Sequence, residues 1–115
     1  MRKSLLQKKI LLIEELTNHN LKMISYFQSD ITKYKLLIIV IKNYFKGDLI
    51  TIEETVNLLP QKISSRAHKL NCITDATIRN YFIKEIKTSD QRIKYLKPSD
   101  ELVEEFKEYC VIFDL

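Results

Sequence analysis

The chain has 115 residues, of which 45% are hydrophobic and 30% are charged, and its formal net charge is +4. This composition is typical of a globular protein and excludes a disordered one, and the length suits a single domain with one core. No apolar run approaches the roughly 18 residues that a membrane-spanning helix needs, so we expect no membrane partner. The short apolar run near the N-terminus is followed by two glutamates and lacks the features of a secretion signal, which indicates a cytoplasmic protein.

Few residues suit catalysis or metal binding. The two cysteines, Cys72 and Cys110, match neither a metal spacing nor a disulfide framework, so we expect two small buried hydrophobes. A redox-sensing thiol at Cys72 is the alternative. His19 and His68 are far apart and have no partner at a ligand spacing, so we expect no metal site and no cofactor. The sequence has no glycine-rich phosphate loop, no nucleophile elbow and no paired carboxylates, which argues against an enzyme.

The charge is distributed unevenly along the chain. Residues 62–97 carry nine basic and three acidic side chains, a net charge of +6, whereas residues 98–115 carry one basic and six acidic side chains. This asymmetry favours a segment that faces a polyanion beside one that does not. A solvated surface with uneven charge is the alternative.

The N-terminal part of the chain has the periodicity of a helix. Apolar side chains recur at three- and four-residue steps from Ser4 to about Phe27. Residues 17–20 break or kink this helix, because their side chains compete for backbone hydrogen bonds. We expect residues 1–28 to take part in dimerisation.

A nearly all-apolar helix is predicted over residues 31–45. Ser29 or Asp30 offers its N-cap, and Gly47, the only glycine, lies where a left-handed C-cap is expected. The apolar pair at residues 49–50 then predicts a short strand.

A helix-turn-helix is predicted over residues 52–77. Thr51 and Glu54 have the spacing of a capping box for its first helix. The second helix begins at Ser64 and Ser65. Pairs of helices joined by a short turn are a common means of presenting one helix to DNA.

The second helix of this pair has an apolar back and a polar front. The residues expected on the back are Ile63, Ala67, Leu70, Ile73 or Thr74, and Ala76 or Thr77. Those expected on the front or sides are Ser64, Ser65, Arg66, His68, Lys69 and Cys72. Serine hydroxyls and the free N–H groups of a helix start suit phosphate oxygens, and Arg66 is the best candidate for bidentate contact with guanine.

A basic β-hairpin follows this helix. Residues 81–87 and 92–97 read as two strands, with Ile83 among the inward residues and the lysines outward. Asn80 tolerates the left-handed turn into the first strand. The layout of a helix followed by a basic hairpin is that of a winged helix.

The tip of the hairpin carries the residues for a second groove. Arg92 suits a narrow minor groove, where the potential is most negative, and Asp90 is expected to pair with Arg92 and orient it. The side chains expected to contact DNA are Lys62, Ser64, Ser65, Arg66, His68, Lys69, Lys87, Ser89, Gln91, Arg92 and Lys94.

The last predicted helix runs from Asp100 to about Phe113, with acids in its first turn and an apolar stripe. This stripe and that of the N-terminal helix exceed what one small domain covers, so we expect a homodimer. The residues expected at the dimer seam are Leu5, Leu6, Ile10, Ile13, Val103, Phe106, Cys110 and Phe113.

These features resemble the MarR-type winged-helix regulators over about residues 31–110. The wing pattern Asp90-x-Arg92-x-Lys94-x-Leu96-x-Pro98-Ser99 and the helix start Ser64-Ser65-Arg66-Ala67 carry the resemblance. It implies that Ser65, Arg66 and His68 face the major groove and Arg92 the minor groove, and that the terminal helices form a homodimer. The chain departs from the family at Asn80, where glycine is commoner, and in having a single helix after the wing.

The sequence therefore predicts a mainly α (α+β) winged helix-turn-helix with a two-stranded hairpin wing and flanking terminal helices. We expect one domain over residues 1–115, made of the segments 1–28, 31–98 and 99–115. The predicted function is sequence-specific binding of double-stranded DNA as a homodimeric transcriptional regulator, and the sequence does not identify a small-molecule effector. A winged-helix module for protein–protein interaction and a non-specific architectural DNA-binding protein are the alternatives.

Overall fold

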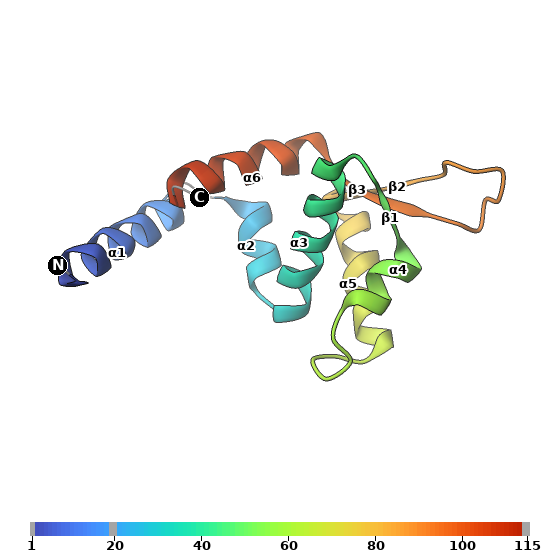
Figure 1. Ribbon diagram of the computed structural model, residues 1–115, viewed down its shortest axis with the longest axis horizontal. Helices are drawn as coiled ribbons and strands as arrows, with labels where there is room; N and C mark the ends of the chain where they lie inside the picture. The colour runs from blue at the N-terminus through green and yellow to red at the C-terminus, as the bar shows by residue number, and fades with distance from the viewer. Residues whose placement is uncertain (1, 19–20, 114–115) are drawn as a thin grey trace.

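The computed structural model describes residues 2–18 and 21–113. The molecule extends 56 × 31 × 23 Å, with the N-terminal helix at one end and a long hairpin at the other (Figure 1). No described helix is long and apolar enough to cross a membrane. The elements are α1 (Arg2–Asn18), α2 (Lys22–Gln28), α3 (Ile31–Lys46), β1 (Ile50–Thr51), α4 (Ile52–Leu58), α5 (Arg66–Ile78), β2 (Phe82–Glu85), β3 (Tyr95–Pro98) and α6 (Asp100–Phe113).

The strands form one antiparallel sheet in the order β1-β3-β2. The sheet confirms the predicted hairpin and adds β1 to it, through the pairing of Ile50 with Leu96. The prediction that Ile83 points inward is wrong, because Ile83 is exposed and its neighbour Phe82 is buried. Phe82 lies opposite Pro98 in the register, and its ring centroid is 5.1 Å from that of Phe27. The aromatic packing with α2 therefore decides which face of β2 points into the core.

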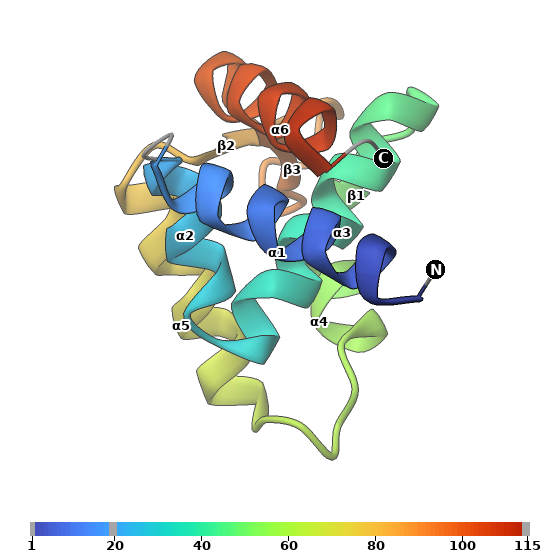
Figure 2. The ribbon, with the colours of Figure 1, turned by 90° about the vertical axis from the view of Figure 1, so that its left-hand side faces the viewer.

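The core lies between α2, α3, α5, α6 and one face of the sheet (Figure 2). Its largest fully buried side chains are Phe27, Phe82, Ile24, Leu36, Leu37, Ile73, Leu96 and Leu102. Complete burial of a side chain of this size contributes about 1.5–3 kcal/mol to folding. The all-apolar centre of α3 is explained by this position, because neighbours cover the helix on several sides.

Predicted caps set several of the element boundaries. Of the two candidates for the N-cap of α3, Ser29 and Asp30, the structure uses Asp30, whose carboxylate accepts the Thr32 N–H at 2.6 Å. Thr51 and Glu54 form the predicted capping box at the start of α4, with hydrogen bonds of 3.0 and 3.1 Å. Ser65 caps α5, and Asn80 adopts the predicted left-handed conformation with φ of 63°.

The terminal helices differ in how much of their apolar surface they bury. α1 contacts α6 and leaves apolar side chains between 48% and 62% exposed: a row of Leu6, Ile10 and Ile13 on one face of the helix, with Leu5 and Leu11 to either side of it. The stripe of α6 packs instead against its own core: Leu102, Val103 and Tyr109 are buried, and Phe106 and Cys110 are partly buried. Val103 is thus corrected from a dimer-seam residue to a core residue, and the side chain of Phe113, like residues 19 and 20, lies outside the part described.

Gly47 ends α3 in the left-handed region, with φ of 78° and open space around the place where a Cβ would stand. Because nothing would clash, Gly47→Ala should cost only the backbone strain, about 1 kcal/mol of the free energy of unfolding. Gly47→Asn should cost less, since asparagine tolerates this conformation. Urea unfolding measures both, and equal stability of all three proteins would contradict the assignment of Gly47 as a left-handed cap.

Candidate nucleic-acid interface

Helix α5 is rotated differently about its axis from the sequence prediction. Its buried face consists of Lys69, Cys72, Ile73 and Ala76. Its exposed face consists of Arg66, Ala67, Asn71, Thr74 and Ile78. Of the residues expected on the apolar back, Ile63 and Ala67 are in fact exposed. Of the two pairs of alternatives, Ile73 and Ala76 are the buried members. The surface available to a partner is therefore centred on Asn71 and Thr74, two residues that the sequence analysis did not select.

Lys69 belongs to the buried face of α5, although it is charged. Its side chain is only 4% exposed, and its ammonium donates to the carbonyl oxygen of Leu59 at 2.9 Å. Leu59 is the C-cap residue of α4, where carbonyl groups lack intrahelical partners and a positive charge is favoured. The long aliphatic stem allows this charge to reach the carbonyl across the buried face. Lys69 thus joins the two helices of the pair, which corrects its expected role as a DNA contact.

The start of α5 presents hydroxyl groups that already have local partners. The hydroxyl of Ser65 accepts the His68 N–H at 3.1 Å, and that of Ser64 accepts the Thr32 hydroxyl at 3.0 Å. Ser65 is exposed and Ser64 is half-buried, while Lys62 in the preceding turn is exposed. These contacts attach the helix start to α3 and leave Ser65 and Lys62 facing outward.

Arg66 is exposed and pairs with Glu53 of α4, with 2.9 Å between Nη2 and Oε2. The guanidinium lowers the pKa of Glu53 below its usual value. Both side chains are more than half exposed, and pairs of this kind add little to stability. Arg66 can therefore leave Glu53 for an anionic or base-edge partner at small cost.

His68 and Cys72 form a half-buried cluster with Asp30 between α5 and α3. The Nε2 atom of His68 lies 3.1 Å from Asp30 Oδ2 and 3.5 Å from the Cys72 sulfur. Burial raises the pKa of the Cys72 thiol, and the residue is 2% exposed. These are the properties of a structural cysteine and not of a reactive thiolate. Among the described residues, no group of three or more potential ligands can hold a metal ion.

The hairpin between β2 and β3 holds Arg92 as expected. Arg92 is 91% exposed, and its guanidinium donates to both carboxylate oxygens of Asp90 at 3.1 Å. The Arg92 backbone N–H donates to the same carboxylate at 3.0 Å, so both contacts fix the direction of the side chain. Arg92 lowers the pKa of Asp90. The predicted pairing of these two residues is confirmed.

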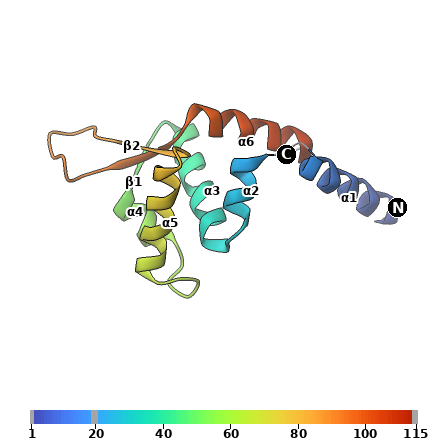
Figure 3. The ribbon, with the colours of Figure 1, turned by 180° about the vertical axis from the view of Figure 1, so that it is seen from behind.

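The remaining wing residues of the predicted set surround Arg92. Lys87, Ser89 and Gln91 are exposed, and Lys94 is half-buried. Seen from behind, α5 lies in front of α4, and the wing extends away beside it (Figure 3). The structure thus brings together α5 and the wing, which carry the predicted DNA contacts. Lys69 is the exception in that set, because its side chain is buried.

Comparison with known proteins defines the fold. No family model matches the sequence, and no curated protein does. A MarR-like protein from Bacillus cereus ATCC 10987 aligns with 98% of this chain and 76% of its own, at 12% identity and a TM-score of 0.56. The heme sensor protein PefR from Streptococcus agalactiae, in complex with heme, aligns with 95% of this chain and 73% of its own, at 15% identity and a TM-score of 0.57. The chain has the winged-helix fold of the MarR-like transcription regulators.

The contact between Lys69 and Leu59 should support the fold. Lys69→Met keeps most of the stem but removes the ammonium, so it should lower the free energy of unfolding by roughly 1–3 kcal/mol. Lys69→Ala should cost more, because it also removes the packing of the stem. Arg66→Ala, the control on the exposed face, should leave stability nearly unchanged in urea unfolding. A Lys69→Met protein as stable as the parent would contradict the capping role.

Proposed function

We propose that the protein binds double-stranded DNA as a homodimeric transcriptional regulator, with α5 in a major groove and the wing at the adjacent minor groove. The observation that carries this proposal is the joint exposure of the polar face of α5 and of Arg92, on a MarR-like winged-helix fold. Helix-turn-helix proteins place such a helix against base edges. The net charge of +6 over residues 62–97 supplies attraction to phosphates.

The exposed face of α5 offers two kinds of base contact. Arg66 has the fork geometry that matches guanine O6 and N7, and Asn71 has the amide that matches adenine N6 and N7. Ala67 and Thr74 place methyl groups on the same face, which suit contact with the methyl group of thymine. We therefore assign sequence readout to Arg66, Asn71 and Thr74. Phosphate contacts are assigned to Lys62, Ser65 and the wing lysines.

Arg92 is assigned to the minor groove. Its pairing with Asp90 holds the guanidinium in one direction before DNA arrives, which reduces the entropy lost on binding. A narrow A·T-rich minor groove has an enhanced negative potential that attracts such a side chain.

Dimerisation is assigned chiefly to α1. Its exposed apolar row includes Leu6 and Ile10, and contiguous exposed apolar surface marks an interaction site. In a twofold dimer the two recognition helices would contact half-sites about one helical turn apart, roughly 34–36 Å.

One observation favours a second candidate function, binding of a protein partner. Ile31, Ile38 and Leu58 are exposed and line a cavity of about 450 Å³ between α3 and α4, together with Tyr34 and Pro60. An apolar contact at this surface would depend weakly on salt, whereas binding through phosphates falls steeply as salt rises.

The assignment of base and phosphate contacts can be tested after selecting bound sequences from random duplexes. Arg66→Ala and Asn71→Ala should each reduce the preference for the selected sequence over random duplex by roughly tenfold or more. Lys87→Ala should weaken both duplexes equally and reduce the salt slope by about one. Lys107→Ala on α6 removes the same charge away from α5 and the wing, and should change neither. Unchanged preference in both α5 variants would contradict the recognition-helix assignment.

The role of α1 can be tested by sedimentation. Ile10→Asp places a charge in the exposed apolar row and should convert a dimer into a monomer with little loss of helicity. Leu58→Asp makes the same change in an exposed leucine of α4 and should leave the dimer intact. A dimer that survives Ile10→Asp, or a parent protein that is monomeric, would contradict the proposed seam.

A further inference from the structure

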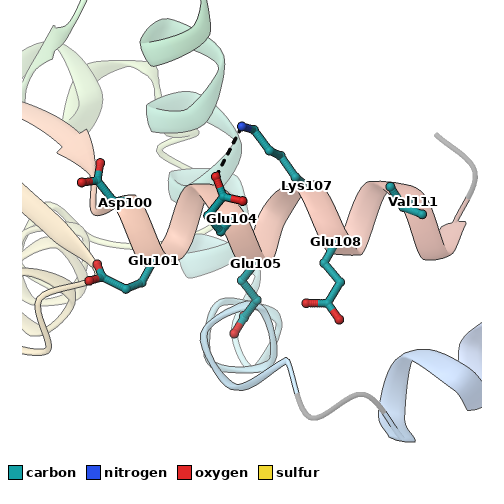
Figure 4. Close-up of a pocket in the computed structure, with 7 residues that line it drawn as sticks. All are labelled: Asp100, Glu101, Glu104, Glu105, Lys107, Glu108 and Val111. Atoms are coloured by element: carbon teal, nitrogen blue, oxygen red, sulfur yellow. Dashed lines mark hydrogen bonds and ion pairs between the residues drawn. The ribbon is translucent and has the colours of Figure 1, made fainter.

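Helix α2 is capped by a residue from another helix. It has seven residues, and its own N-cap residue, Leu21, gives no side-chain hydrogen bond. The carboxylate of Glu105 in α6 accepts the Ile24 N–H at 2.7 Å and also interacts with the Met23 N–H. Glu105 points toward the start of α2, whereas Glu104 of the same helix pairs with Lys107 (Figure 4). Burial raises the pKa of Glu105 above its usual value.

The other end of α2 is joined to the recognition helix. The hydroxyl of Tyr26 donates to the carboxylate of Asp75 in α5, and the same carboxylate accepts from Arg79 Nε at 2.9 Å. The guanidinium of Arg79 also lies 4.6 Å from the centre of the Tyr26 ring. A second cation, the ammonium of Lys33 in α3, lies 4.5 Å from the centre of the same ring. Tyr26 is thus held by charged groups from two helices at the end of α5.

The middle of α2 cannot absorb a shift at either end. Ile24 and Phe27 are 1% and 0% exposed, and the Phe27 ring packs against Tyr26, Tyr81 and Phe82. A helix of two turns has little stability of its own, so its geometry depends on these contacts. A close-packed interior transmits such displacements instead of damping them.

We infer that Glu105 and Tyr26 are positioning residues that couple α6, through α2, to the last turn of α5. Glu105 holds the first turn of α2, α2 fixes Tyr26, and Tyr26 fixes Asp75 and Arg79. Loss of the cap on α2 therefore loosens the end of the recognition helix, although no hydrogen bond or ion pair of the described residues joins Glu105 to α5. The structural coupling does not depend on the proposed function, whereas any effect of it on DNA binding rests on that function.

Hydrogen exchange on the full chain without DNA tests the coupling. The readout is the last turn of α5, whose amides at Arg79, Asn80 and Tyr81 donate to Asp75, Thr77 and Ala76. Glu105→Ala should raise exchange there by about fivefold, the effect of losing a typical N-cap. Glu105→Gln keeps an acceptor oxygen and should restore the parental rates. Glu104→Ala, the control, removes the same charge one residue earlier and should change nothing.

Two results of this experiment would overturn the inference. One is that the Glu105→Ala protein exchanges the amides in the last turn of α5 no faster than the Glu104→Ala control does. The other is that Glu105→Ala raises the exchange rates in β2, β3 and α3 as much as in the last turn of α5. Such a result would mean that Glu105 acts only on global stability.

A double-variant cycle separates coupling from two independent effects. Tyr26→Phe removes only the hydroxyl and should raise exchange in the same turn of α5. If both residues act through one path, adding Glu105→Ala to Tyr26→Phe should produce little further increase, whereas additive effects would overturn the inference. DNA affinity of the same variants is measured separately. Altered exchange with no DNA binding by the parent would retain the coupling and contradict the proposed function.

Discussion

The burial of Cys72, Ile73 and Ala76 in the core sets the rotation of α5 about its axis, and much of the proposed interface depends on that rotation. A helix in a small domain has one stripe to bury, and the side chains opposite that stripe are the ones a partner meets. Lys69 belongs to the buried stripe because its ammonium reaches the carbonyl oxygen of Leu59, the C-cap residue of α4. The same contact fixes α4 beside α5, which places Glu53 within reach of Arg66.

The charge asymmetry of the sequence corresponds to two different surfaces. The basic segment contains α5 and the wing, where a polyanion can replace Glu53 as the partner of Arg66 and where Asp90 orients Arg92. The acidic segment is α6, whose acids serve other purposes: Glu104 pairs with Lys107, and Glu105 caps α2. The acidic side chains are spread along α6, which packs on the core and also contacts α1 (Figure 4). Electrostatic attraction of DNA would therefore favour one end of the molecule.

The sequence predicted the features that depend on neighbours in the chain. The Asp30 and Ser65 caps, the Thr51–Glu54 box, the left-handed Gly47 and Asn80, and the hairpin are local, and short-range hydrogen bonds decide them. The features that it missed depend on contacts distant in sequence. β1 joins the sheet by pairing with Leu96, and Phe82 is buried in place of Ile83 because Phe27 packs against it. On α5, Ile73 and Ala76 were among the residues expected on the buried back, but Ala67 was placed there wrongly and Lys69 and Cys72 were placed outward. Sequence alone favours an exposed position for a lysine, and the carbonyl oxygen that holds Lys69 belongs to Leu59, ten residues earlier in the chain.

The most direct test of the account is an NMR titration of the full chain with a duplex that it selects, followed through backbone amide shifts. The account predicts the largest changes at residues 66–78 and at wing residues 86–94, with α3 and α4 next to the apolar cavity unaffected. Within α5, changes should be greatest around Asn71 and Thr74. Changes confined to the α3–α4 surface, or none in α5 and the wing while DNA is bound, would contradict the claim that these elements form the interface.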